Sequence, residues 1–251
     1  MKQGLQLFSV YIMMLAENIP IYFARIFRRK ETGMDSITQY FQLAARRPEL
    51  FAPSDQIPLC MDEETLRNYS ASTGKPVGVV YDNSPYYFVL ADLCIRENGE
   101  LYTYARVVYP HKSNGVVVIP CRNGRFGLLS IFRHPPRMES GGEFPRGFGE
   151  DLTPAENGAK ELWEELGVRI APEDLEFLGE IQTDTGISAG KVQVFCAQVG
   201  EVDIPADNGE GIHGLRWVTP EEMAQQVADG TITDGITLGA YLQYLCRKKH
   251  S

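Results

Sequence analysis

Three glutamates lie close together in a segment of the chain that has strong helix signals. Glu161, Glu164 and Glu165 occupy positions i, i+3 and i+4, which fall on one side of an α-helix. Adjacent carboxylates repel one another unless a cation or solvent separates them. Oxygen ligands on a rigid helix suit a hard ion such as Mg²⁺, which takes few carboxylates and completes its shell with phosphates and water. The spacing therefore predicts either a magnesium site or a solvated acidic helix face.

The helix that carries these glutamates has clear predicted ends. Thr153 is a suitable N-cap, Pro154 suits the first helical position, and Glu156 completes a capping box. Gly167 suits the position that ends the helix. Just before it, residues 143–149 contain a proline and two glycines, which allow the backbone to approach a ligand closely. This loop favours the ligand-binding interpretation over the solvated face.

Together, the loop and the helix resemble the Nudix box, in which a glycine loop precedes a helix with the pattern Arg-Glu-x-x-Glu-Glu-x-Gly. The helix here reads Lys160-Glu-Leu-Trp-Glu-Glu-Leu-Gly-Val168. The resemblance implies that Glu164 and Glu165 bind a metal ion. It also implies that Glu161 acts in catalysis by binding the metal or its water, and that the Arg146 carbonyl is a further ligand. The implied cofactor is Mg²⁺, with Mn²⁺ as an alternative ion.

Two departures from the box bear on activity. Lys160 replaces the arginine of the pattern, and lysine lacks the bidentate fork that holds one orientation. The loop with Gly147 and Gly149 is also shorter than usual, so Leu152 falls where the box has its first glutamate; Glu150 could substitute through a shifted loop. These departures leave open a Nudix-like module that binds or regulates through nucleotides without efficient turnover.

More of the chain is similar to the branch of this family that hydrolyses ADP-ribose and ADP-sugars. Arg133 and Glu143 match an arginine and a glutamate that lie near the substrate in that branch. Glu210, on a glycine-flanked loop, matches a glutamate that serves as base or extra metal ligand, although it could be a solvent-exposed loop acid. Residues 229–234 resemble the branch's C-terminal Asp-Gly-x-Ile-x-Asp segment. Thr185 replaces the branch's marker proline, which leaves open another NDP-sugar or a dinucleotide as the substrate.

The resemblance implies a magnesium-dependent hydrolase that cleaves the pyrophosphate bond of a nucleoside diphosphate linked to another moiety. ADP-ribose or an ADP-sugar is the favoured substrate, and ADP-ribose would yield AMP and ribose 5-phosphate. The partner is therefore a small molecule, and the branch implies a homodimer.

The elements that must position these residues follow from the pattern of apolar side chains. Turn residues separate three stretches rich in valine, tyrosine and phenylalanine, which predict a small antiparallel meander: 77–81, 86–95 and 100–108. A buried hairpin, the acidic helix, three further strands and two closing helices are expected next: 115–121, 126–132, 153–166, 175–183, 192–199, 215–218, 220–228 and 236–246.

The expected fold class is therefore α/β, a Nudix-type α/β/α sandwich with a mixed sheet, preceded by the antiparallel meander and a helical N-terminal extension. The corresponding boundaries are 1–75 for the extension, 76–112 for the small β region and 113–251 for the Nudix hydrolase domain.

Composition narrows the remaining function classes. The formal net charge of −9 argues against a nucleic-acid surface, because phosphate backbones are bound by clustered lysine and arginine. Five scattered cysteines without a Cys-x-x-Cys pair predict free thiols and a cytoplasmic protein. The apolar stretches within residues 1–30 are too short to span a bilayer, and they favour a packed helix over one lying on a membrane surface.

Overall fold

The computed structural model describes residues 34–109, 115–149, 151–202 and 211–249, and the chain divides into two compact units, Met1–Val108 and Tyr109–Ser251. Three of the predictions concern the apolar N-terminal stretch, Glu150 and Glu210, which lie outside the described residues. Within the described ranges, no helix is both long and apolar enough to cross a membrane.

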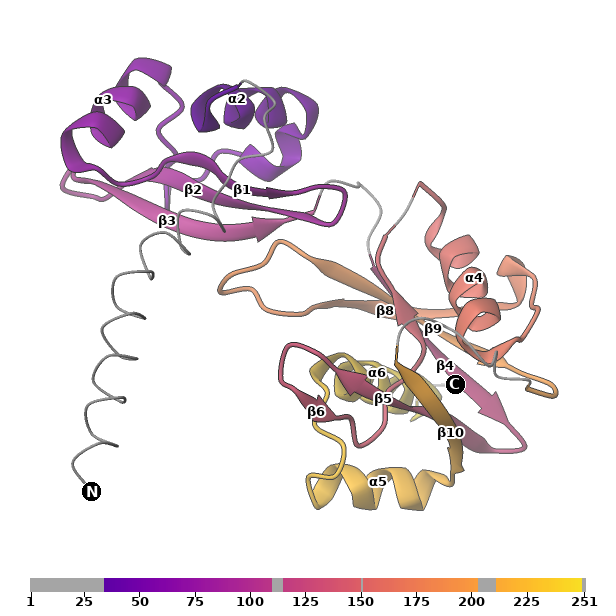
Figure 1. The fold of residues 1–251 in the computed structure, drawn as a ribbon. Helices are drawn as coiled ribbons and strands as arrows, with labels where there is room; N and C mark the ends of the chain where they lie inside the picture. The colour runs from indigo at the N-terminus through magenta and orange to yellow at the C-terminus, as the bar shows by residue number, and fades with distance from the viewer. Residues whose placement is uncertain (1–33, 110–114, 150, 203–210, 250–251) are drawn as a thin grey trace, which may run out of the picture. The chain divides into compact units, whose positions relative to one another are not determined.

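The first unit is a three-stranded antiparallel sheet with helices packed on it (Figure 1). Its strands follow one another in sheet order: β1 (Gly78–Asn83), β2 (Tyr87–Ile95) and β3 (Leu101–Val108). The helical elements come first: α2 (Ser36–Arg46), the 3₁₀ helix η1 (Pro48–Phe51) and α3 (Glu63–Thr73). Tyr40 of α2, Leu66 of α3 and Leu90 of β2 are fully buried in one shared core. The predicted meander is confirmed.

The second unit is built on a mixed sheet with the order β10-β5-β4-β9-β8. Its strands are β4 (Gly115–Arg122), β5 (Arg125–Arg133), β6 (Met138–Glu139), β7 (Arg146–Gly147), β8 (Glu176–Gln182), β9 (Lys191–Gln198) and β10 (Ile212–Val218). The β4–β9 pair is parallel and the other pairs are antiparallel. Asn123 and Gly124 both have positive φ, as the two-residue turn of the predicted hairpin requires.

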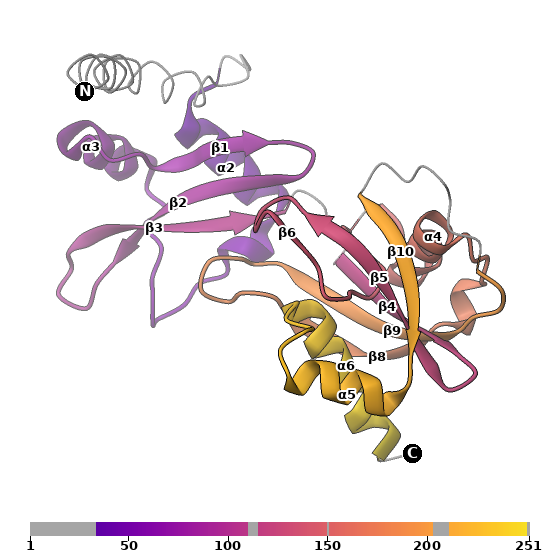
Figure 2. The same ribbon diagram turned by 60° about the horizontal axis from the view of Figure 1, so that its bottom comes forward.

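Helices cover both faces of this sheet, because β4 is apolar on both of its sides. Val116 and Val118 belong to the core beneath α4 (Pro154–Leu166), whereas Val117 and Ile119 belong to the core beneath α5 (Pro220–Ala228) and α6 (Gly235–Lys249). The 3₁₀ helix η2 (Pro172–Asp174) leads from α4 towards β8. Figures 1 and 2 show α4 on one side of the sheet and α5 and α6 on the other. The predicted α/β/α sandwich is confirmed.

Candidate active site

The ends of α4 are set by the capping residues that the sequence predicts. The Thr153 side chain accepts a hydrogen bond from the Glu156 backbone, and the Glu156 side chain accepts one in return from the Thr153 backbone. At the other end Gly167 adopts a left-handed conformation with φ of 67°, which favours glycine. These local contacts fix where α4 begins and ends.

One face of α4 carries a stripe of buried polar side chains spaced four residues apart. Asn157, Glu161 and Glu165 are only 1%, 6% and 3% exposed. The adjacent stripe, which includes Leu162 and Leu166, packs into the apolar core against the sheet. Burying carboxylates is costly unless they are paired with polar or charged groups. The environment of these side chains therefore decides what the helix can do.

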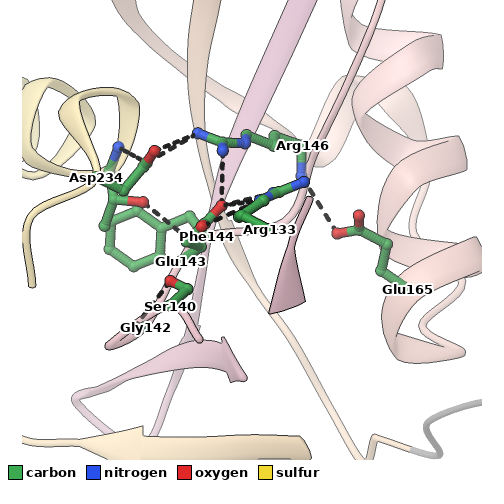
Figure 3. Close-up of polar contacts among 9 residues, drawn as sticks. Arg133, Ser140, Gly142, Glu143, Phe144, Arg146, Glu165 and Asp234 are labelled. Atoms are coloured by element: carbon green, nitrogen blue, oxygen red, sulfur yellow. Dashed lines mark hydrogen bonds and ion pairs between the residues drawn. The ribbon is translucent and has the colours of Figure 1, made fainter. Parts of the chain in front are cut away.

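The two buried glutamates face the backbone turn that precedes the helix. The Glu165 Oε2 atom accepts a hydrogen bond of 3.2 Å from the backbone N–H of Arg146 (Figure 3). The Glu161 carboxylate lies against Gly147 so closely that a Cβ atom there would be 2.0 Å from Glu161 Oε1. Glycine at this position therefore makes the space that the carboxylate occupies. The next glycine, Gly149, is partly buried at the end of the same turn.

Asn157 is a member of this stripe that the sequence reasoning missed. Its Nδ2 atom donates a 2.7 Å hydrogen bond to the carbonyl of Phe148, and so ties the turn to the helix. Its Oδ1 atom is buried and has no hydrogen-bond partner among the described residues. The signal that could have identified it is its spacing, because it lies four residues before Glu161 on the same helix face.

Glu164 lies apart from the other two glutamates. Its carboxylate is half-exposed and accepts a 2.7 Å hydrogen bond from Lys160 Nζ. The same Lys160 Nζ atom lies 3.7 Å from Glu161 Oε1. The structure thus brings Glu161 and Glu165 to the turn and leaves Glu164 on the flank of the helix. Within the described ranges, no three His, Cys, Asp or Glu side chains form a group that could hold a metal ion.

The donor atoms at the turn are nevertheless of the type that a divalent cation requires. Two buried carboxylates, Glu161 and Glu165, stand beside the backbone of Arg146. Magnesium is commonly held by one or two carboxylates together with substrate phosphates and water. These residues therefore fit a cation that shares its coordination with a phosphate. Leu152, at the position of the missing box glutamate, is exposed and adds no oxygen donor from its side chain.

Arg133 and Glu143, the predicted substrate residues, form a direct ion pair. Arg133 Nε and Nη2 lie 2.9 and 2.5 Å from Glu143 Oε2. The Glu143 side chain is buried, whereas 31% of the Arg133 side chain is exposed. Burial lowers the pKa of Arg133, but the Glu143 carboxylate together with the charges of Asp234 and Glu165 raises it, so the net pKa lies above its ordinary value. Arg133 is therefore a permanently charged group with a surface that an anion can reach.

Asp234 is a second site residue that sequence reasoning did not assign. Both of its carboxylate oxygens lie 2.8 Å from Arg146 Nη1. Burial raises the pKa of Asp234, but the Arg146 guanidinium and the Thr237 backbone N–H lower it further, so that the net pKa falls below the ordinary 3.8. The stability that this pair contributes is thus complete above pH 3.8 and is lost as the pH falls through the lower pKa of the folded protein. The signal in the sequence was the acidic end of segment 229–234.

The second unit is an α/β/α sandwich with a mixed sheet, and it holds a glutamate-bearing helix against a glycine turn. This architecture is the Nudix fold. Residues 111–235 match the family model described as the NUDIX domain, so the chain contains a NUDIX domain, as its motif predicted. Nudix enzymes generally use divalent metal cations.

A crystal structure titled as that of an ADP compounds hydrolase is similar in fold to this chain. The TM-score is 0.55 and the sequence identity is 19%, with 67% of this chain and 88% of that chain covered. At this identity the likeness concerns the fold. No curated protein matches the chain.

The contact between Gly147 and Glu161 leads to a specific prediction. In a Gly147→Ala variant, the added methyl group would occupy the space of the Glu161 carboxylate and displace it. Because the displaced atoms end a flexible side chain, we expect little change in melting temperature. We expect catalytic efficiency to fall about 100-fold, as is usual when a reacting group is misplaced. Steady-state kinetics and thermal melts would measure the two effects.

Gly200→Ala is the matched control, because nothing lies within 4 Å of a Cβ atom at that position. It should leave both activity and melting temperature unchanged. Full activity in Gly147→Ala would show that the position of the Glu161 carboxylate is irrelevant to the reaction.

Proposed function

We propose that this protein hydrolyses the pyrophosphate bond of a nucleoside diphosphate linked to another moiety, with Mg²⁺ as cofactor and ADP-ribose as the favoured substrate. The observation that carries the proposal is the burial of Glu161 and Glu165 against the Arg146–Gly147 turn. Burying two carboxylates side by side is costly, and a bound cation with its phosphates would add to the compensation that Lys160 gives to Glu161.

In the proposed reaction, the oxygen of a water molecule forms a bond to one phosphorus of the diphosphate, and the anhydride P–O bond breaks. ADP-ribose would yield AMP and ribose 5-phosphate. A bound divalent cation supplies charge neutralisation and activation of water in such reactions. Glu161, Glu165 and Glu164 with the Arg146 carbonyl are the proposed ligands. Glu161 is also the proposed acceptor of the water proton, a role for which Glu210 is the second candidate.

The preference for an ADP-linked substrate rests on the groups around the turn. Arg133 presents a charged and partly exposed guanidinium that can bind a phosphate. Phe148, directly after Gly147, is 65% exposed and packs on the ring of Tyr109 at 5.9 Å, so an apolar surface adjoins the acidic one. The ADP compounds hydrolase of similar fold also supports an ADP-linked substrate.

Two features favour alternative readings. Thr185, which replaces the marker proline, is exposed on a loop and favours another NDP-sugar or a dinucleotide as substrate. Lys160 binds the carboxylate of Glu164, a proposed metal ligand, and Leu152 replaces the first glutamate of the box. Both features favour a Nudix-like module that binds nucleotides with low turnover.

A substrate panel tests the proposal. We expect purified protein with Mg²⁺ to release AMP and ribose 5-phosphate from ADP-ribose faster than it cleaves UDP-glucose or diadenosine polyphosphates. Product chromatography identifies the broken bond, and hydrolysis in ¹⁸O-water identifies which phosphorus is attacked. EDTA should abolish the reaction, and Mn²⁺ added afterwards should restore it. Hydrolysis that is unaffected by EDTA, or nucleotide binding without any product, would refute the proposed activity.

A further inference from the structure

Four charged side chains form an unbroken line of alternating sign beside the turn (Figure 3). Arg133 contacts Glu143, Glu143 Oε2 also lies 2.7 Å from Arg146 Nη2, and Arg146 Nη1 contacts Asp234. The two arginines thus share one buried carboxylate, and Asp234 forms an ion pair with Arg146. The four formal charges sum to zero.

Exposure increases from Glu143 towards both ends of this line and is greatest at Arg133. Glu143 is buried, Arg146 and Asp234 are mostly covered, and Arg133 is the most exposed of the four. Both guanidiniums contact the same oxygen of Glu143, Oε2, and a buried charge that loses one of its partners is left uncompensated at a cost in free energy. The position of Arg133 therefore depends on how much of Glu143 is already taken by Arg146.

Asp234 is itself held rigidly by the start of α6. Its Oδ1 atom accepts a 2.8 Å hydrogen bond from the Thr237 backbone, and its carbonyl accepts one of 2.9 Å from Leu238. The hydroxyl of Thr237 in turn accepts a 3.2 Å hydrogen bond from the backbone N–H of Phe144. The first turn of α6 thus contacts the 143–147 segment at two positions, one through a charge and one through a hydroxyl.

We propose that Asp234 is a positioning residue that, by holding the Arg146 guanidinium, leaves Glu143 to orient Arg133 towards the diphosphate of the substrate. This inference rests on the proposed function for the role of Arg133, but the arrangement of the four side chains can be tested without it. When the Asp234 charge is absent, Glu143 is the remaining carboxylate partner of Arg146, and the two guanidiniums compete for its oxygens. Arg133 then loses its orientation.

The test uses Asp234→Asn in the full-length protein, because asparagine keeps the shape and can still accept from Thr237. NMR of the arginine Nε–Hε groups reports on both guanidiniums directly. We expect the signals of Arg146 and Arg133 to move, although in the described part of the chain the ion pair of the Asp234 carboxylate is with Arg146 and not with Arg133. Asp229→Asn is the matched control. It also removes an aspartate that accepts a backbone hydrogen bond, from Thr231, and it should leave both signals in place.

Kinetics supplies the second readout. Loss of a partner that orients a functional group typically costs about 10- to 100-fold, and we expect Asp234→Asn to lower kcat/KM for ADP-ribose within that range. The loss should vanish in an Arg146→Gln background, because the effect is transmitted through Arg146. Asp234→Glu should recover part of the activity, whereas Asp229→Asn should retain all of it.

The outcomes separate this inference from the proposed function. An Arg133 signal that stays in place in Asp234→Asn overturns the inference, whether or not any substrate is cleaved. A kinetic loss that persists undiminished in the Arg146→Gln background overturns it as well. If the wild-type protein cleaves no nucleotide, the proposed activity fails, and a displaced Arg133 signal would still establish the positioning contact.

Discussion

A Glu165→Gln variant should lose at least about 100-fold in kcat with ADP-ribose and Mg²⁺, while its melting temperature stays close to that of the wild type. The glutamine can still accept the hydrogen bond from the Arg146 backbone, so the turn should keep its shape. It cannot supply the negative charge that the proposed cation requires, and removing a group of this kind typically costs two or more orders of magnitude. Steady-state kinetics at several Mg²⁺ concentrations would separate weaker cation binding from slower chemistry.

The three glutamates should not be equivalent in this experiment. Glu161 and Glu165 are buried at the turn, whereas Glu164 is half-exposed beside Lys160. We therefore expect the losses in Glu161→Gln and Glu165→Gln to exceed the loss in Glu164→Gln. Glu173→Gln, which changes an exposed glutamate on η2 of the same unit, is the control and should be fully active. Equal activity in Glu165→Gln and this control would remove the basis for the metal assignment.

An Asp92→Ala variant should lose about 3–5 kcal/mol from the stability of the first unit, the usual result of removing one partner from a buried ion pair. The Asp92 side chain is 4% exposed, and its oxygens lie 2.5 Å from the Tyr40 hydroxyl and 2.5 Å from Arg106 Nε. Burial, and then the nearby Asp92 charge, raise the pKa of Tyr40, which remains a neutral donor. Without Asp92, the buried Tyr40 hydroxyl loses this acceptor, and the mostly buried Arg106 guanidinium loses its carboxylate partner and keeps the hydrogen bond to the Leu50 carbonyl.

The position of the tryptophans makes this effect measurable in the intact chain. Both of them, Trp163 and Trp217, lie in the second unit. Circular dichroism during urea unfolding reports on both units, whereas tryptophan fluorescence reports on the second. We expect Asp92→Ala to move part of the dichroism transition to lower urea and to leave the fluorescence transition in place. Hydrogen exchange along β2 would confirm that the loss is in the first unit.

An exposed ion pair in the same unit provides the comparison. Glu63 and Arg67 lie one turn apart on α3 at 2.6 Å, and both side chains are largely exposed. Solvent screens the attraction within such a pair, so Glu63→Gln should shift the transition only slightly. A shift in Asp92→Ala no larger than that in Glu63→Gln would show that the buried network does not hold α2 on the sheet.

Local signals in the sequence were sufficient for the main strands and for the ends of the acidic helix, whereas the short strands β6 and β7 were not predicted. The cap at Thr153, the stop at Gly167 and the turn at Asn123 all depend on hydrogen bonds or dihedral preferences within a few residues, and each appears where it was expected. The burial of β4 on both of its faces followed from its apolar run in the same way. Sequence alone therefore determined which main elements form and which glutamates share the helix.

Tertiary structure decided which of those glutamates enter the site and what holds the turn beside them. Positions i+3 and i+4 are both near one helix face, and only the packing of α4 buries Glu165 and leaves Glu164 half-exposed. The contact between Arg146 and Asp234 spans 88 positions of the chain. It exists because α6 packs on the sheet face opposite α4 and brings its first turn to the 143–147 segment. Such a contact depends on the packing of whole elements, which the spacing of residues does not encode.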